Sequence, residues 1–291
     1  MTRHFALLVN PAAAGGRARE VLPVVRGVLD RLDARYRVIE TRSLEHARDE
    51  ADAAANHGET VATLGGDGLV GPIAGVMQGR EAAMALLPGG RGNDFARMLG
   101  TPPDPAAATR VAVQGRERLV DVAEVDGSPY VGIASFGFDS DANRFANEAK
   151  LVRGNLVYAY AALRALARWK PADFTVTVDG ERHELTGYSV AVGNSKYFGG
   201  GMMLLPDAEV DDGRLDVLTV SKHPKWRYLK GLTQVFKGEH LDPRWTNVFR
   251  GKVVKVGSER PFVIYADGDP IGATPATMRV HPRSLRVIVP A

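Results

Sequence analysis

A carboxylate stands inside a glycine-rich turn in the first half of the chain. Residues 65–68 read Gly-Gly-Asp-Gly, follow the apolar run at 60–64, and precede an apolar segment that begins at Leu69. A strand, a glycine turn and a helix in this order present backbone N–H groups to a phosphate at the helix N-terminus. Asp67 would repel that phosphate unless a cation lay between them. The turn therefore indicates a Mg²⁺-nucleotide site, although an ordinary glycine turn can have the same sequence.

Two familiar phosphate-binding patterns are absent from the sequence. It contains no G-x-x-x-x-G-K-[ST] run, and no lysine precedes Lys150. It also lacks a G-x-G-x-x-G run that opens a helix after the first strand. These absences argue against a P-loop nucleotide site and against a dinucleotide-binding Rossmann turn.

Alternating strands and helices are expected to position the glycine turn. Small-residue turns at 10–17, 65–68 and 88–94 each follow a predicted strand, and ligands bind at the carboxyl ends of strands in parallel sheets. The alternation predicts an α/β domain with a parallel sheet and helices on its faces. The predicted strands are 5–9, 37–41, 60–64 and 82–87, and the predicted helices are 18–32, 44–56, one from 69 with Pro72 in its first turn, 95–99 and 106–114.

After Asp121 the pattern changes to short strands separated by turns, which predicts a mostly antiparallel β domain. Two helices, Leu156 to Trp169 and 225–237, are expected to interrupt it. We therefore predict domains at 1–126 and 127–291, and the last strand is free to return to the first domain. The predicted strands are 120–126, 130–134, 173–179, 182–184, 187–193, 215–220, 253–256, 262–265, 277–280 and 285–289.

Length and composition limit the function classes. The chain has 291 residues, which suggests two domains, and 45% of them are hydrophobic. It has no cysteine, which excludes disulfides, thiol catalysis and thiolate zinc sites. Its first apolar run is too short for a signal-peptide core and no run reaches membrane-spanning length, so we expect a soluble cytoplasmic protein.

The basic charge lies in the second half of the chain. Residues 1–127 carry a net charge of −2 and the remainder carries +5. This imbalance favours an anionic partner. Because the basic residues are dispersed and no nucleic-acid-binding motif occurs, we expect peripheral association with an anionic membrane and no nucleic acid.

Eight motifs in one order carry a resemblance that covers nearly the whole chain. Together they resemble the diacylglycerol kinase catalytic family, in its soluble bacterial lipid-kinase branch, which is related to sphingosine kinases. The resemblance implies a nucleotide-binding α/β domain like that of NAD kinases and phosphofructokinases, followed by a β-sandwich domain that holds the lipid. The motifs are Asn10-Pro11 with its glycines, 65–68, 90–97, Gly193-Asn194, 197–202, 206–208, 211–216 and 267–269.

The resemblance also implies a set of nucleotide-binding residues. Thr41 has an alternative role as a helix N-cap, and Asn93 with Asp94 could likewise cap a helix. The implied ATP-binding residues are Asn10, Pro11, Gly15, Gly16, Arg17, Thr41, Gly65, Gly66, Asp67, Gly68, Leu69, Gly71, Arg91, Asn93 and Asp94.

Two acidic turns are implied to complete the site. The family's general base ends an Asp-Gly-Glu run, which here is Asp267-Gly268-Asp269, so Asp269 is the implied base with Asp267 beside it. Asp212 would hold Mg²⁺ with backbone oxygens near Glu209 and Arg214. A plain hairpin turn and a solvated acidic turn are the alternatives for these two segments.

Two positions depart from the family pattern. Leu69 stands where the family usually has Thr after the glycine turn, and Arg91 replaces another Thr. Two hydroxyls that would contact phosphate or Mg²⁺ are missing, and one cation is gained. Arg91 could bind phosphate in bidentate geometry, or the exchange could impair the use of ATP.

We therefore expect an ATP- and Mg²⁺-dependent kinase that phosphorylates a lipid hydroxyl, with diacylglycerol as the leading substrate. A kinase for sphingoid bases or other lipid alcohols, and a non-catalytic lipid- or nucleotide-binding regulator, are the alternatives. The apolar helix Leu156 to Trp169 could line an acyl-chain cavity or simply belong to the core. Residues 221–230 could be an interfacial helix or a solvated one, and a homodimer is possible.

Overall fold

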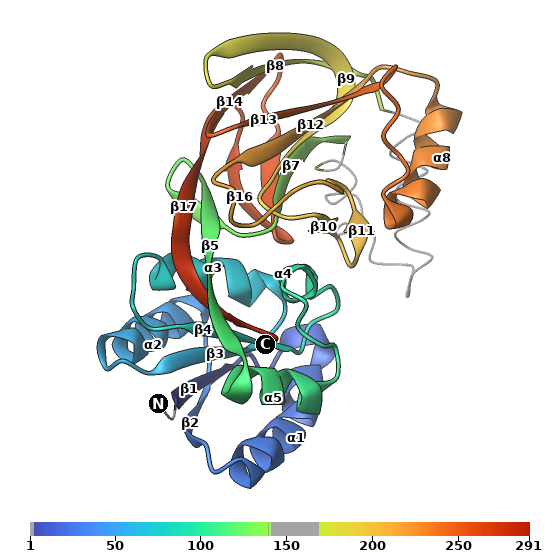
Figure 1. Ribbon diagram of the computed structural model, residues 1–291. Coiled ribbons are helices and arrows are strands. Elements are labelled where there is room, and N and C mark those ends of the chain that lie inside the picture. Colours follow the sequence, from blue (N-terminus) through green and yellow to red (C-terminus); the bar gives the residue numbers. More distant parts are fainter. Residues whose placement is uncertain (1–2, 139, 141–168) are drawn as a thin grey trace.

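Two layered units build the protein, shown in a computed structural model that describes residues 3–138, 140 and 169–291 (Figure 1). The helix expected at Leu156 to Trp169 lies outside the described residues, apart from its last residue, Trp169. The N-terminal unit is an α/β layer structure and the C-terminal unit is an antiparallel β-sandwich, as the sequence predicted. The division of the chain near residue 126 stays a prediction.

Four parallel strands form the N-terminal sheet in the order β4-β3-β1-β2. Strands β1, β3 and β4 are buried along almost their whole length, which explains why their sequences are apolar without alternation. The strands are β1 (His4–Val9), β2 (Arg35–Glu40), β3 (Thr60–Gly65) and β4 (Met84–Pro88).

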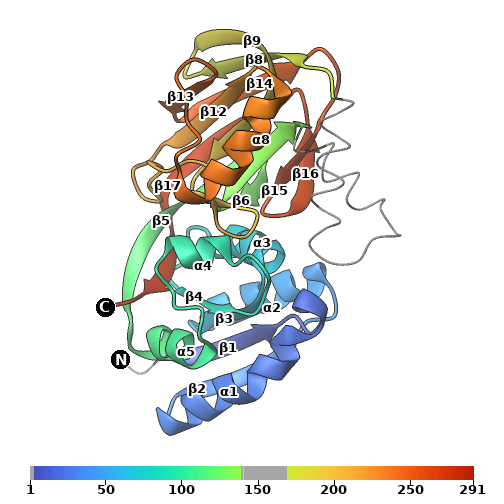
Figure 2. The same ribbon diagram turned by 90° about the vertical axis from the view of Figure 1, so that its right-hand side faces the viewer.

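Helices cover both faces of this sheet (Figure 2). Successive residues of β1 point to opposite faces: Ala6 and Leu8 pack with α2 and α3, whereas Phe5 and Leu7 pack with α1 and α5. The helices are α1 (Arg17–Arg31), α2 (Leu44–Asn56), α3 (Asp67–Met77), α4 (Asp94–Met98) and α5 (Pro105–Gln114), and a 3-10 turn, η1 (Ala13–Gly15), precedes α1.

The C-terminal unit contains antiparallel strands around an aromatic-rich core that includes Phe136, Phe174 and Phe262. Helix α8 (Lys225–Gln234) continues into a 3-10 turn, η2 (Val235–Lys237). The strands are β5 (Arg116–Val125), β6 (Ser128–Tyr130), β7 (Ile133–Gly137), β8 (Ala172–Val178), β9 (Glu181–Gly193), β10 (Tyr197–Phe198), β11 (Met202–Met203), β12 (Leu215–Ser221), β13 (Thr246–Gly251), β14 (Val253–Ser258), β15 (Val263–Ala266), β16 (Asp269–Ala273) and β17 (Ala276–Val289).

The long strand β17 runs through both units (Figure 1). It pairs with β14 in the sandwich, with β5 along most of its length, and in parallel with β4, where Val287 lies opposite Met84. Because β5 and β17 leave one unit and enter the other as a paired ribbon, they fix how the two units face one another.

Several predicted boundaries were wrong, and each has a local cause. The strand predicted at 130–134 is two strands, because the N–H groups of Val131 and Gly132, between β6 and β7, donate to the carboxylate of Asp267. Two pairs of predicted strands are single strands: β9 contains 182–184 and 187–193, and β17 contains 277–280 and 285–289. Strand β17 continues through the predicted break with an irregularity in its pairing after His281. Strands β10, β11, β13 and β16 were not predicted.

The helix after the glycine turn begins earlier than predicted. Gly66 is extended and α3 starts at Asp67, so Pro72 lies in the second turn and not in the first. The helix forgoes one backbone hydrogen bond at this proline. Among the described residues, none of the helices combines the length and the hydropathy that a membrane crossing requires.

Asp121 ties the acidic turn at 211–213 to the β5–β17 ribbon. This fully buried carboxylate accepts the backbone N–H groups of Gly213 and Arg283, both at 2.7 Å. In the same turn Asp211 pairs with Arg118 at 2.8 Å, but both side chains are partly exposed. The buried contact should therefore matter more for stability than the exposed one.

Asp121→Ala should leave two buried N–H donors unsatisfied, at a cost of about 1–3 kcal/mol for each. Asp211→Ala removes a partly exposed ion pair and should cost under about 1 kcal/mol. Urea unfolding monitored by circular dichroism measures both free energies of unfolding. Equal losses in the two variants would show that Asp121 does not hold the junction.

Candidate active site

Four loops at the carboxyl ends of the parallel strands meet around one cavity of about 660 Å³. They follow β1, β2, β3 and β4, and one residue of the sandwich unit, Asp269, closes the cavity from the other side. The lining residues are Asn10, Pro11, Ala12, Ala13, Ala14, Gly15, Thr41, Arg42, Ser43, Leu44, Gly66, Gly68, Leu69, Gly90, Arg91 and Asp269. Eight of the predicted nucleotide-binding residues, from Asn10 to Arg91, are among them.

Glycine is required where the loops after β3 and β4 touch. A Cβ atom added at Gly90 would lie 2.4 Å from the Cα of Gly66, and the N–H of Gly89 donates to the carbonyl of Gly65 at 2.8 Å. Real Cβ atoms do not approach backbone so closely, so no side chain fits between the two loops. The close contact leaves backbone, rather than side chains, facing the cavity.

The remaining predicted nucleotide-binding residues lie around the cavity, not on its wall. Gly16 and Arg17 begin α1, with Gly16 at a φ of 105° and Arg17 exposed to solvent. Gly65, Asp67 and Asn93 line a narrow crevice behind the glycine loops. Gly71 lines a neighbouring cavity, and Asp94 is buried in the first turn of α4.

The capping alternatives for two of these residues were wrong. Thr41 does not cap α2: its hydroxyl donates to the carbonyl of Val9 at 3.1 Å, and Ser43 is the N-cap. Asn93 stands before α4, but its side chain closes the turn to Gly90 instead of capping the helix. Both side chains therefore shape the loops that line the cavity.

Asp67, which is half-buried, and Asp94, which is buried, form a pair of carboxylates between α3 and α4. A Cβ atom at Gly92 would lie 2.8 Å from Asp67 Oδ2 and 3.4 Å from Asp94 Oδ2, so both carboxylates face the same spot. Asp67 accepts the N–H of Phe95, and burial together with the charge of Asp94 raises the pKa of Asp67 to about 6. Asp94 accepts the N–H of Gly200 at 2.8 Å, which brings the sandwich unit against α4.

Carboxylate oxygens are ligands that a hard cation prefers, so the chemistry of this pair suits one. Asp94 Oδ1 is buried and has no hydrogen-bond donor in the described part of the chain. At the predicted magnesium site, Asp212 accepts the N–H of Arg214 at 2.9 Å. No cluster of three or more metal-binding side chains occurs among the described residues. The site at Asp212, Glu209 and Arg214 stays a prediction.

One face of α3 consists of glycines, and the sandwich unit packs directly onto it. Cβ atoms at Gly68, Gly71 and Gly75 would lie 2.6 Å from Asp269, 2.9 Å from Asp267 and 2.2 Å from Pro129. These glycines are spaced three and four residues apart, so they share one side of the helix. The two carboxylates of the turn at 267–269 therefore lie against the helix that carries the glycine turn.

The carboxylate of Asp267 is held in place by hydrogen bonds from the backbone. Its two carboxylate oxygens accept the N–H groups of Val131 and Gly132, each at 3.0 Å, in the gap between β6 and β7. Its φ of 52° places it in the left-handed region. Burial, and secondarily the charges of Asp67 and Asp94, raise the pKa of Asp267 to about 7.

Asp269 lies at the border of two cavities. It lines the loop-bounded cavity and also a neighbouring one of about 710 Å³, whose wall includes Gly68, Gly71, Pro270 and Ile271. Partial burial raises the pKa of its carboxyl above the ordinary value. A carboxylate in this place can accept a proton from a group in one cavity while an anionic group lies in the other.

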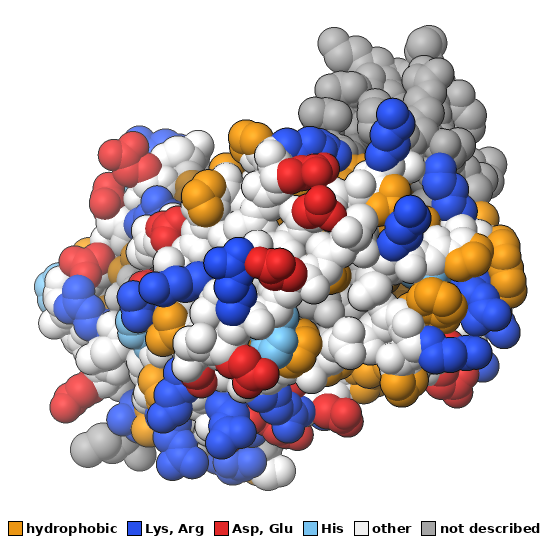
Figure 3. Space-filling model, turned by 90° about the horizontal axis from the view of Figure 1, so that it is seen from above, with side chains coloured by type: hydrophobic (Ala, Val, Ile, Leu, Met, Phe, Trp, Pro, Cys, Tyr) orange, Lys and Arg blue, Asp and Glu red, His pale blue; other side chains and the backbone are white. Residues whose placement is uncertain are grey.

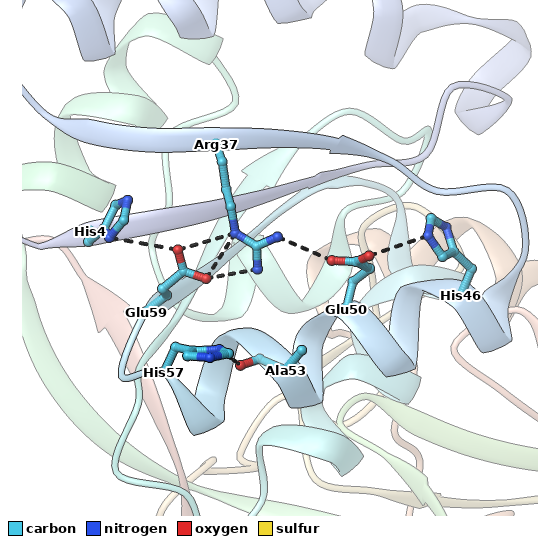
Figure 4. Close-up of polar contacts among 7 residues, drawn as sticks. All are labelled: His4, Arg37, His46, Glu50, Ala53, His57 and Glu59. Atoms are coloured by element: carbon cyan, nitrogen blue, oxygen red, sulfur yellow. Dashed lines mark hydrogen bonds and ion pairs between the residues drawn. The ribbon is translucent and has the colours of Figure 1, made fainter.

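Sequence reasoning missed Arg42, which lines the loop-bounded cavity together with Arg91. Its loop is held by a polar chain that Figure 4 shows in part. The N–H of Arg42 donates to His46 Nδ1 at 3.2 Å, and His46 faces Glu50, which pairs with Arg37 at 3.2 Å. A basic residue directly after Thr41, in a loop at a strand end, was the available signal.

Two family models together span most of the chain. Residues 4–125 match the diacylglycerol kinase catalytic domain, and residues 132–289 match the YegS C-terminal NAD kinase beta sandwich-like domain. The two matches correspond to the two units of the fold.

Named relatives and a solved structure agree with these matches. The chain is 32% identical over 248 residues to a diacylglycerol kinase of Mycobacterium tuberculosis, covering 82% of this chain and 80% of that protein. It is 31% identical over 235 residues to the "Probable lipid kinase YegS-like" of Pseudomonas aeruginosa, covering 80% and 77%. A crystal structure of a diacylglycerol kinase from Bacillus anthracis matches with a TM-score of 0.81 at 23% identity, over 99% and 97% of the two chains, which shows the shared fold. The protein therefore belongs to the diacylglycerol kinase catalytic-domain family of lipid kinases.

Proposed function

We propose that this protein transfers the γ-phosphoryl group of ATP to the free hydroxyl of diacylglycerol, which yields phosphatidic acid. The observation that carries the proposal is the place of Asp269, whose carboxylate borders both the loop-bounded cavity and its neighbour. A phosphoryl-transfer enzyme needs a proton acceptor at such a border. The names of two relatives, a diacylglycerol kinase and a lipid kinase, support the substrate class.

The loop-bounded cavity suits a triphosphate because glycine-rich backbone and two cationic side chains line it. Arg42 and Arg91 both line it, both are exposed, and the described residues provide no carboxylate in an ion pair with either. Guanidinium groups bind phosphate oxygens in bidentate fashion. We propose that they supply the positive charge that the missing P-loop lysine would provide.

Leu69 does not weaken this proposal. Its side chain is 5% exposed and packs in the hydrophobic core on one face of the sheet. A Cβ atom added at Gly65 would lie 3.1 Å from its Cδ2 atom, so the side chain packs against the glycine turn. Its role is to hold the glycine turn in place. The exchange of a hydroxyl for this side chain therefore gives the regulator hypothesis little support.

Asp67 and Asp94 are the residues that fit a Mg²⁺ ion accompanying ATP. When bound, such an ion neutralises charge on the phosphates during transfer. The chain's own groups then have separate tasks in our proposal. The glycine loops and both arginines orient the triphosphate, Asp267 holds the 267–269 turn, and Asp269 Oδ accepts the proton of the attacking lipid hydroxyl.

A cavity of about 600 Å³ in the sandwich unit supports a lipid substrate over a water-soluble alcohol, because large apolar side chains line it together with charged ones such as Lys230 and Glu239. It lies beneath α8, between that helix and the sheet of β9 and β12. Apolar walls of this size are typical of sites that bury most of a hydrophobic ligand. Side chains that line it include Phe198, Met202, Leu204, Leu218, Tyr228 and Trp245.

The substrate is tested by incubating the protein with labelled ATP and mixed micelles that contain diacylglycerol, sphingosine or no lipid. We expect labelled phosphatidic acid, identified by chromatography. A labelled sphingoid phosphate alone would replace the proposed substrate with the alternative lipid alcohol. Label in neither lipid would leave the regulator hypothesis.

Asp269→Asn should lower kcat by about 10²–10⁴-fold, because the amide keeps the size of the side chain but cannot accept the proton. The Kd for ATP, measured by calorimetry, should stay within about twofold because the amide leaves the N–H groups of the cavity in place. Asp269→Glu is the matched variant and should keep measurable turnover. Wild-type turnover in Asp269→Asn would contradict the assigned base.

Arg42→Ala and Arg91→Ala should each raise the Kd for ATP about tenfold, which corresponds to roughly 1.4 kcal/mol. Arg48→Ala is the matched control, because Arg48 lies on α2 and lines the neighbouring cavity but not the loop-bounded one. If all three variants bind ATP equally well, the arginines do not contact the phosphates.

A further inference from the structure

All the charged lysine, arginine and acidic side chains of the segment 222–237, which we call the α8 segment, are positive. No acidic residue occurs between Asp216 and Glu239. The α8 segment consists of the connection from β12 to α8, the helix α8 and the 3-10 turn η2. Its five cationic residues are Lys222, Lys225, Arg227, Lys230 and Lys237.

The same segment exposes large apolar side chains to water. Trp226 is 61% exposed, Phe236 is 58% exposed and Leu232 is 36% exposed. They are not simply displaced core residues, because the opposite side of the helix already packs inward: Val235 is buried, and Tyr228 contacts the sandwich core. The helix has one face for the core and a second, partly apolar face for something else.

Apolar and basic side chains are interleaved on the exposed part of α8, where Trp226 and Lys230 also border the cavity of about 600 Å³. Trp226, Lys230 and Lys237 recur at helical spacing, so they lie on one side. The guanidinium of Arg227 lies 4.9 Å from the centre of the Trp226 ring and 5.7 Å from that of Trp245, which holds the exposed indole in place. Figure 3 shows hydrophobic and basic side chains next to one another on the side of the molecule that carries α8.

We propose that the α8 segment docks this protein on an anionic lipid bilayer, with Trp226 and Phe236 in the interface and the lysines against the headgroups. A basic helix with an exposed tryptophan and phenylalanine has the composition of an interfacial helix. The inference rests on the proposed function, since a diacylglycerol kinase must take its substrate from a membrane. Docking through α8 also places the cavity beneath that helix next to the lipid.

A second copy of this chain fits the face less well than lipid does. A two-fold symmetric contact would bring the α8 segment of one copy against that of another. The cations of both copies would then face one another, with no acidic residue of either segment to pair with them. The one-sign charge therefore favours a surface that supplies the negative charge itself.

Vesicle sedimentation at low and high salt tests the inference, with phosphatidylcholine vesicles compared with vesicles that also contain phosphatidylglycerol. The wild-type protein should bind the anionic vesicles at least tenfold more tightly than the neutral ones, and salt should weaken the binding. Trp226→Ala, Phe236→Ala and the pair Lys222→Glu with Lys237→Glu should each weaken binding to anionic vesicles by about tenfold.

The pair Lys252→Glu with Lys255→Glu is the matched control, because it makes the same change in net charge on exposed positions of the sandwich outside the α8 segment. It should bind almost as well as the wild type. Equal losses in both pairs would show that net charge alone acts and would overturn the inference. The inference would also be overturned if the Phe236→Ala variant and the Lys222→Glu with Lys237→Glu pair both bound anionic vesicles as tightly as the wild type.

Turnover of a water-soluble, short-chain diacylglycerol separates this inference from the proposed function. Phe236→Ala and the Lys222→Glu with Lys237→Glu pair should phosphorylate it at the wild-type rate while they lose activity on vesicles. A wild-type protein that binds vesicles through α8 but phosphorylates no lipid would refute the proposed function and leave the docking face standing. Light scattering that shows a dimer lost in the α8 variants would instead assign the face to self-association.

Discussion

The structure depends on the glycine face of α3, because the β-sandwich unit can approach the glycine loops only where that helix has no side chains. A Cβ atom at Gly68 would lie 2.6 Å from Asp269, and one at Gly71 would lie 2.9 Å from Asp267. Glycine inside a helix costs roughly 1 kcal/mol relative to alanine. The helix accepts this cost twice so that two carboxylates of a distant hairpin can stand beside the glycine turn.

This close approach also concentrates negative charge. Burial is the main cause that raises the pKa of Asp67 to about 6 and that of Asp267 to about 7. The charge of Asp94 adds to the rise at Asp67, and the charges of Asp67 and Asp94 add to the rise at Asp267. Such a cluster is poorly stabilised by the protein alone. Arg42 and Arg91 line the adjoining cavity, so both signs of charge are present in this part of the molecule.

Local sequence signals predicted the elements well where one residue type decides the outcome. Helix α2 begins and ends at Leu44 and Asn56, as predicted, because Ser43 caps it and alanines face the sheet. The glycine turns were also found, since steric contact between Gly66 and Gly90 leaves no choice of residue. The break between β6 and β7 was missed because its cause, Asp267, lies more than a hundred residues further along the chain.

The same limit explains what happened at the site. The family resemblance predicted that Asp269 and the glycine loops belong to one site. It could not predict that both carboxylate oxygens of Asp267 accept hydrogen bonds from the N–H groups of Val131 and Gly132. Nor could it find Arg42, whose position depends on a hydrogen bond from its backbone to His46. Contacts between segments that are distant in sequence decide which carboxylate is held fixed and which stays free to react.

A crystal structure of the protein with a non-hydrolysable ATP analogue, Mg²⁺ and a short-chain diacylglycerol tests the central claim most directly. The account predicts that the γ-phosphate lies against the turn at 66–68 and that the lipid hydroxyl lies within about 3 Å of the Asp269 carboxylate. A triphosphate bound outside the loop-bounded cavity, or a lipid hydroxyl far beyond hydrogen-bonding distance of Asp269, would contradict it.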